Sequence, residues 1–234
     1  MAEAPASVPQ TKFAVYCGAS PGHDPKHLAM ARELAQAMAK HNIGLVYGGG
    51  TIGVMGEIAK TLVSLSGPSA VHGIIPDPLI RYERNLPKSD DGSAPVKKST
   101  TSGQPVLPDE SIWGRTTVVP DMHTRKKLMA QEVFQGGPGS GFIALSGGYG
   151  TIEEMFETAT WNQLGIHKNG ICLLNVDGFY DGILQWIEKS SSEGFISGAN
   201  KDIIVTATDA EGAIRQLREY KLSADTMKLE WGEQ

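Results

Sequence analysis

Short apolar runs recur along the chain at a spacing that is typical of alternating strands and helices. Each run is bounded by glycine, proline or polar residues and is too short for a buried helix, so it predicts a strand that is buried on both faces of a sheet. The runs are Phe13–Cys17, Gly44–Tyr47, Val71–Ile75, Thr116–Val119, Phe142–Leu145, Ile171–Val176 and Ile203–Thr206.

Amphipathic helical patterns lie between these runs. The first pattern is predicted to open at Asp24 and Pro25, which are residues that favour the first positions of a helix. Its apolar stripe consists of Leu28, Ala31, Leu34, Ala35 and Met38. The second pattern is predicted to end at Gly67, and later helices are predicted over 121–135 and 213–220.

This alternation predicts an α/β fold with a doubly wound, mostly parallel, Rossmann-like sheet and helices on both faces. We expect a single domain over residues 11–234, preceded by a disordered tail at 1–10. The polar stretch at about 84–115 predicts an exposed, mobile insertion. Folds of this class bind ligands beyond the carboxyl ends of the strands, where this chain carries its glycines.

Composition and charge disfavour several classes of protein. The 234-residue chain has a formal net charge of −5, so it lacks the basic surface that nucleic acids and anionic membranes attract. No apolar run approaches the ~20 residues of a membrane span, and the N-terminus lacks the pattern of a secretory signal. Cys17 and Cys172 both fall in predicted buried strands. We therefore expect no disulfide and a cytoplasmic protein.

Two glycine-rich turns, Gly48–Gly50 and Gly147–Gly150, each lie between a predicted strand and a predicted helix. Free backbone N–H groups and the helix dipole at such a turn can bind phosphate, although glycines also occur there for tight packing alone. Two turns of this kind in one chain favour a phosphorylated ligand. The dinucleotide fingerprint is absent after the first strand, which disfavours an ordinary nicotinamide enzyme.

Arg125 and Glu154 are candidate catalytic residues, and each also has a purely structural interpretation. Glu154 follows Thr151 at the spacing of a capping box, in which it would bond the Thr151 backbone N–H; alternatively it faces the ribose of a bound nucleotide. Arg125 follows Asp121 by one helical turn and would pair with it; alternatively it binds phosphate or supports a leaving base. Lys126 adds a second cation.

No Cys-x-x-Cys motif occurs in the sequence, and we expect no metal site. A pyridoxal-phosphate lysine motif is also missing.

In combination and order, a set of motifs along the chain is highly specific. The motifs are Val46–Gly50, Gly53–Gly56, Met122–Lys126, Gly147–Glu154, Trp161–Ile166 and Leu174–Tyr180. Over nearly its whole length the chain resembles the Lonely Guy family of cytokinin-activating phosphoribohydrolases, formerly labelled possible lysine decarboxylases. Two positions depart from the family pattern. Ser146 stands where proline is usual, and Thr124 stands where an acidic residue or glutamine is frequent.

The resemblance implies that Arg125 and Glu154 form the catalytic pair. Together with the glycine turns, it implies substrate contacts at Ser20, Gly48, Gly49, Glu83, Met122, Lys126, Gly147, Gly148, Tyr149, Gly150, Thr151, Ile152, Glu153 and Thr160. We expect the glycine turns and Lys126 to anchor a 5′-phosphate. The side chain of Ser146 is expected to contribute nothing.

The activity that the resemblance implies is hydrolysis of the N-glycosidic bond of a cytokinin riboside 5′-monophosphate, an N6-substituted AMP, to free base and ribose 5-phosphate. It also implies that the reaction needs no cofactor. It further implies that the protein is a homodimer with the active site near the subunit interface. A general AMP nucleosidase and a non-catalytic nucleotide- or cofactor-binding protein stay open as alternatives. We expect Glu154→Gln and Arg125→Ala to abolish turnover with the fold intact.

Overall fold

The computed structural model describes residues 10–80 and 107–231. Glu83, most of the predicted insertion and nearly all of the predicted tail lie outside the described residues. Within the described ranges, no helix is long and apolar enough to cross a membrane.

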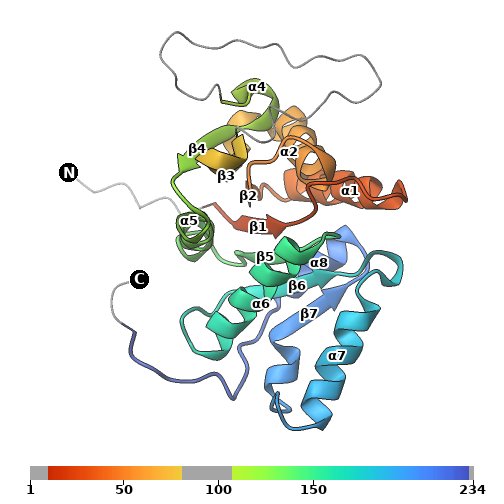
Figure 1. The fold of residues 1–234 in the computed structure, drawn as a ribbon, viewed down its shortest axis with the longest axis vertical. Helices are drawn as coiled ribbons and strands as arrows, with labels where there is room; N and C mark the ends of the chain where they lie inside the picture. Colours follow the sequence, from red (N-terminus) through yellow and green to blue (C-terminus); the bar gives the residue numbers. More distant parts are fainter. Residues whose placement is uncertain (1–9, 81–106, 232–234) are drawn as a thin grey trace, which may run out of the picture.

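A seven-stranded sheet runs through the molecule (Figure 1). The strands are β1 Lys12–Tyr16, β2 Gly44–Tyr47, β3 Val71–Pro76, β4 Arg115–Val119, β5 Gly141–Ala144, β6 Gly170–Leu174 and β7 Ile204–Ala207. Their order is β4-β3-β2-β1-β5-β6-β7, and every pairing is parallel. The predicted doubly wound parallel sheet is confirmed, with strand boundaries close to those expected.

Helices cover both faces of the sheet (Figure 1). The helices α1 Lys26–Lys40, α2 Gly53–Ser66 and α8 Ala210–Arg218 contribute to the hydrophobic core on one face. The helices α5 Met122–Phe134, α6 Tyr149–Gln163 and α7 Asp181–Ser192 pack on the other face. Shorter helical segments are η1 Pro68–Ala70, α4 Glu110–Trp113, η2 Val176–Gly178 and η3 Asn200–Ile203.

The central strands are the most enclosed part of the core. Phe13 on β1 and Phe142 on β5 have no exposed surface, and neither has Leu34 of α1. Burial of each such side chain stabilises the fold by about 1.5–3 kcal/mol. The carboxyl ends of β1 and β5 are therefore held in a rigid frame. Cys17 and Cys172 are buried free thiols, as predicted.

Two helices begin at positions that differ from the prediction. The helix α1 begins at Lys26 with Pro25 as its N-cap, one residue later than predicted, and Asp24 accepts a 2.9 Å hydrogen bond from the Lys26 backbone N–H. The helix α8 begins at Ala210, before the predicted start at 213, because Asp209 accepts a 2.7 Å hydrogen bond from the Gly212 backbone N–H.

The last part of the predicted insertion is regular structure. Residues 110–113 form α4, which opens with Asp109 accepting a hydrogen bond from the Ser111 backbone N–H over 2.9 Å. Arg115 then already belongs to β4 and pairs with His72 of β3. Although residues 109–115 are mostly polar, they contain a short, capped turn of helix that leads into the edge strand β4.

The winding of the sheet reverses between β1 and β5. The strands β2, β3 and β4 are added in turn on one side of β1, whereas β6 and β7 are added in turn on the other side of the sheet, beyond β5. Just beyond the strands, the Gly18 backbone N–H donates to the Ser146 carbonyl over 3.0 Å, and the Leu145 N–H donates to Tyr16 over 2.9 Å. The loops after β1 and β5 thus leave the sheet side by side, at the position where such folds bind ligands.

We predict that Gly53→Ala lowers the free energy of unfolding by more than about 2 kcal/mol in urea titrations. Gly53 opens α2 with φ of +63°, and a Cβ there would lie 2.4 Å from the carbonyl carbon of Ala19. Gly67→Ala is the matched control, since Gly67 has φ of +82° but open space around it. The control should cost only about 1 kcal/mol. Equal losses would show that the contact between α2 and the β1–α1 loop is not tight.

Candidate active site

A cavity of about 840 Å³ opens beyond the carboxyl ends of β1 and β5. Its walls come from the β1–α1 loop, the first turns of α1 and α2, the start of α5, the β5–α6 loop and the turn after β6. The apolar part of the lining includes Val54, Met55, Met122, Val176 and Phe179. A cavity of this size, mostly apolar with a few convergent polar groups, is typical of a site for a small organic ligand.

The β5–α6 loop forms the glycine-rich wall of this cavity. A Cβ on Gly147 would lie 2.1 Å from the Thr151 hydroxyl oxygen and 2.9 Å from the Gly18 nitrogen, so only glycine fits there. Gly148 and Gly150 instead have nothing within 4 Å of a built Cβ, and both line the cavity. The first glycine therefore serves packing, while the next two leave backbone and the N-terminus of α6 open to a ligand.

Arg125 and Glu154 form a buried ion pair in the cavity wall. The guanidinium Nη2 of Arg125 donates to Oε1 of Glu154, and each residue is only 7% exposed. Among the described residues, Nε of Arg125 has no hydrogen-bond partner. The pair joins α5 to α6, the helices that precede and follow β5 in the chain, and so brings opposite charges together across these two helices.

Burial raises the pKa of the Glu154 carboxyl above its ordinary value, and the nearby Arg125 guanidinium opposes this rise without cancelling it. The backbone of Glu154 is also held in place. Its carbonyl accepts a 2.7 Å hydrogen bond from the Thr158 hydroxyl, which lies 3.1 Å from the buried Tyr16 hydroxyl. Burial, aided by the charge of Glu154, raises the pKa of Tyr16 far above its usual range, so this phenol stays neutral.

The two purely structural interpretations of these residues are wrong. The N-cap of α6 is Gly148, so Thr151 lies inside the helix, and Glu154 bonds Arg125 instead of the Thr151 N–H. Asp121 does not pair with Arg125. It caps α5 by accepting hydrogen bonds of 2.8 and 2.9 Å from the backbone N–H and hydroxyl of Thr124.

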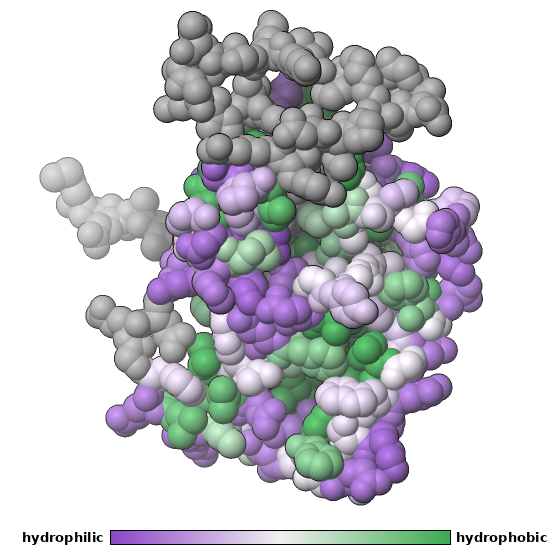
Figure 2. Space-filling view, in the orientation of Figure 1, coloured by the Kyte–Doolittle hydropathy of each residue, from purple (hydrophilic) through white to green (hydrophobic). Residues whose placement is uncertain are grey.

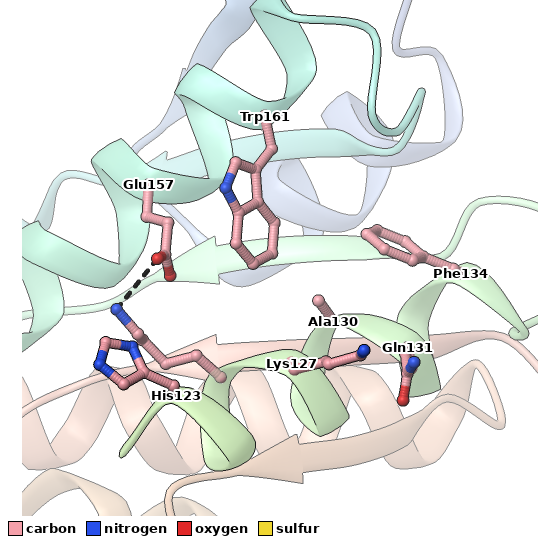
Figure 3. A pocket seen from close by; sticks show the side chains of 8 residues that line it. His123, Lys127, Ala130, Gln131, Phe134, Glu157 and Trp161 are labelled. Carbon is pink, nitrogen blue, oxygen red and sulfur yellow. Dashed lines mark hydrogen bonds and ion pairs between the residues drawn. The ribbon is translucent and has the colours of Figure 1, made fainter. Parts of the chain in front are cut away.

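Lys126 lies in a different place from the ion pair. Its ammonium binds Glu153 at 2.6 Å and Glu157 at 3.0 Å, beside a smaller pocket of about 250 Å³ between α5 and α6. His123, Glu157 and Trp161 line this pocket (Figure 3). The side chain of Lys126 is not part of the lining of the larger cavity, and its role as a phosphate anchor stays a prediction.

The other glycine turn supports the site indirectly. Gly48 and Gly49 are not part of the cavity lining. A Cβ on Gly48 would lie 3.3 Å from Nη1 of Arg125, and Gly49, with φ of +75°, packs against Ile75. This turn leaves room for the guanidinium of Arg125.

The remaining predicted contacts divide into two groups. Those that line the cavity are Ser20, Met122, Gly147, Gly148, Gly150 and Thr151. Those that lie outside its lining are Tyr149, which is 98% exposed, the half-buried Ile152, and the exposed Glu153 and Thr160. The predicted contact Glu83 is outside the described residues.

Sequence reasoning missed His27, and it assigned no site residue to the turn after β6, although that turn lies in the motif Leu174–Tyr180. Nδ1 of the buried His27 lies 2.8 Å from the Ser146 hydroxyl, and Phe179 packs edge-on against the imidazole with ring centroids 5.2 Å apart. At the cavity rim, Lys26 binds Asp177 at 2.5 Å. The only signal in the sequence was the proximity of His27 to the predicted start of α1, which faces the carboxyl edge of the sheet.

Fold and site together define a doubly wound α/β protein with a buried arginine–glutamate pair at its topological switch point. The family model described as "Possible lysine decarboxylase" matches residues 55–217, and the chain belongs to this family.

Curated relatives carry more specific names. The chain is 39% identical over 224 residues to cytokinin riboside 5′-monophosphate phosphoribohydrolase LOG7 of Arabidopsis thaliana, a match that covers 95% of this chain and 88% of that protein. It is 48% identical over 219 residues to the bifunctional cytokinin biosynthesis protein of Fusarium pseudograminearum. That match covers 93% of this chain but only 42% of the length of the Fusarium protein.

Solved structures share the fold at low sequence identity. The molybdenum cofactor binding protein of Rippkaea orientalis superposes with a TM-score of 0.58 at 16% identity, covering 91% of this chain and 98% of that chain. The molybdenum cofactor carrier protein of Chlamydomonas reinhardtii gives a TM-score of 0.54 at 19% identity, covering 89% and 98%.

We predict that Arg125→Ala lowers the free energy of unfolding by about 3–5 kcal/mol at about pH 8, because it leaves a buried carboxylate without its cation. A carboxyl with a raised folded-state pKa stabilises the fold at low pH and loses that contribution as the pH rises through its folded-state pKa. The cost of Arg125→Ala should therefore be smaller at about pH 5. Urea titrations at both pH values measure it.

The double variant Arg125→Ala/Glu154→Gln controls this test, since it removes the stranded charge. It should recover much of the stability at about pH 8. A cost that is equal at both pH values, with no recovery in the double variant, would contradict a charged Glu154 held by Arg125.

Proposed function

We propose that this protein hydrolyses the N-glycosidic bond of cytokinin riboside 5′-monophosphates, releasing the free N6-substituted adenine and ribose 5-phosphate. The observation that carries the proposal is the buried Arg125–Glu154 pair in a cavity whose wall is a glycine turn at a helix N-terminus. The names of the relatives, at 39% identity over 95% of the chain, support the same reaction.

The phosphate is proposed to lie at the β5–α6 loop. Gly148 and Gly150 have open space where side chains would be, and Thr151 lies beside them in the cavity wall. Backbone N–H groups at the start of α6, together with the helix dipole, favour a dianion there. This remote binding energy holds the ribose against Glu154, one helical turn further along α6.

The bond change itself needs no group beyond water and the protein. The oxygen of water bonds to C1′ of the ribose while the C1′–N9 bond breaks and its electron pair passes to the base. Positive charge develops on the sugar, as in glycoside hydrolysis, where Glu154 stabilises it or accepts the proton of the water. That proton then passes to the departing base, so that Glu154 returns to its starting state. A raised pKa suits Glu154 to that proton transfer near neutral pH.

Arg125 is proposed to support negative charge on the departing base. Its Nε has no partner among the described residues and so retains hydrogen-bonding capacity beside Glu154. The guanidinium stays charged at every physiological pH. A binding protein that hydrolyses nothing would not need this pair, and the likeness to molybdenum cofactor carriers concerns the fold alone.

A homodimer with the site near its interface is part of the proposal. Phe156 of α6 and Trp186 of α7 form what we call the α6–α7 patch; Trp186 is 52% exposed and packs edge-on against Phe156, with ring centroids 5.3 Å apart. Figure 2 shows hydrophobic side chains grouped over the region of α6 and α7. Phe179, which precedes α7, is 48% exposed and lines the cavity. A partner that covered both the patch and Phe179 would border the cavity.

The free thiols of Cys17 and Cys172 support a reducing cytoplasmic location. The continuous sheet of the described residues supports a single catalytic domain over residues 11–234.

We predict that Glu154→Gln lowers kcat for N6-isopentenyl-AMP by about a thousandfold or more, because the amide neither carries charge nor accepts a proton. Chromatography of free base and ribose 5-phosphate measures the rate. Glu132→Gln is the matched control, since Glu132 is also ion-paired on a cavity-facing helix but lies outside the cavity lining.

The same assay with AMP decides the substrate. Release mainly from N6-isopentenyl-AMP is the expected result, and comparable release from both nucleotides would favour a general AMP nucleosidase. An active, folded Glu154→Gln variant would refute the role of Glu154, and no release by the wild-type protein would favour a binding protein.

We predict that the protein sediments with twice the 25.0 kDa mass of one chain, and that Trp186→Asp shifts it to the monomer by placing a charge in the α6–α7 patch. Leu65→Asp on α2 is the control: Leu65 is 54% exposed on the opposite face of the sheet, and its replacement should leave the mass unchanged. Sedimentation of the wild-type protein as a monomer would contradict the dimer.

A further inference from the structure

We infer that His27 is a positioning residue for the phosphate-binding loop, acting through the hydroxyl of Ser146. The inference rests on the proposed function, because it assigns that reaction a residue outside the Arg125–Glu154 pair. The side chain of Ser146, which we expected to contribute nothing, is the link.

Ser146 is the point at which the β5–α6 loop leaves the rigid sheet. It is buried, its carbonyl accepts a 3.0 Å hydrogen bond from the Gly18 N–H, and its hydroxyl lies 2.8 Å from Nδ1 of His27. The next residue, Gly147, is packed tightly against Thr151 and Gly18. The loop therefore enters the cavity from an anchor that α1 and the β1–α1 loop both hold.

The imidazole of His27 is itself held on more than one side. Phe179 packs edge-on against it, and a Cβ on Gly22 would lie 3.0 Å from its Cδ2. The adjacent Lys26 binds Asp177, so α1 is tied to the turn after β6 at the same level. His27 thus connects the loops after β1, β5 and β6, which together form most of the cavity wall.

A glycine-rich loop needs such an anchor because glycine loses more conformational freedom on becoming ordered than any other residue does. Gly148 and Gly150 have no side chains to fix the direction of their N–H groups. A bond to Ser146, two residues before Gly148, restricts the start of the loop and so preorganises its N–H groups for an anion. Loss of this bond should weaken binding of the phosphate-bearing ligand more than it slows the bond-breaking step.

The test compares His27→Ala, His27→Asn and His27→Gln with the wild-type protein. The amide of Asn reaches the position of Nδ1, whereas the amide of Gln extends toward the position of Nε2. We expect His27→Ala and His27→Gln to raise KM for N6-isopentenyl-AMP about tenfold, the scale of one lost hydrogen bond, with a smaller change in kcat. His27→Asn should restore KM to within about twofold of wild type.

Calorimetric titration with ribose 5-phosphate provides a second readout that needs no turnover. The dissociation constant should rise about tenfold in His27→Ala and in Ser146→Ala, and the double variant should be no worse than either single variant. His72→Ala is the matched control. The imidazole of His72 is also hydrogen-bonded to other side chains, those of Glu132, Thr117 and Arg115, but it lies outside the cavity lining, so its loss should leave the dissociation constant unchanged.

Three results would overturn the inference. They are wild-type affinity in His27→Ala, a His27→Asn variant as defective as His27→Ala, and an equal loss of affinity in His72→Ala. Failure of the wild-type protein to release base, with ribose 5-phosphate still bound more weakly by His27→Ala than by wild type, would refute the proposed hydrolysis and leave the anchor established.

Discussion

The buried ion pair between Arg125 and Glu154 is the constraint on which the rest of the site depends. A carboxylate with 7% exposure is costly to keep charged, and a single guanidinium partner offsets that cost only if both side chains are held rigidly. The fold supplies this rigidity from several directions. Gly48 leaves room for the guanidinium, and Thr158 holds the backbone of Glu154. Burial in turn raises the pKa of Glu154, so the packing around this carboxyl also sets how readily it takes up a proton.

The reversal of winding between β1 and β5 places the β5–α6 loop, which we propose binds phosphate, next to this pair. The parallel strands β1 and β5 are neighbours at the switch point, so the loops that follow them lie side by side. The hydrogen bond from the Gly18 N–H to the Ser146 carbonyl joins these two loops. The helix α6 then carries Glu154 one turn below its own N-terminus. In the proposed complex, a ligand whose phosphate lies at that N-terminus has its sugar beside the carboxylate.

Much of this arrangement could be predicted from the sequence, because strand and helix periods are local signals. The strands, the parallel sheet and the glycine turns all follow from such signals, and the motif resemblance identified Arg125 and Glu154. Long-range pairing could not be predicted in the same way. Asp121 is one turn from Arg125 but bonds Thr124, which is nearer its own carboxylate, and the bond between His27 and Ser146 joins segments that only the folded sheet brings together.

Hydrolysis of N6-isopentenyl-AMP in ¹⁸O-labelled water tests the central claim most directly, with the products separated and weighed by mass spectrometry. The account predicts one ¹⁸O atom at C1 of ribose 5-phosphate in promptly quenched samples, in excess of the label that unlabelled ribose 5-phosphate takes up by exchange in the same water, and none in the released base, because the oxygen of water bonds to the sugar. Label in the base, an unlabelled sugar phosphate, or the absence of both products would contradict it.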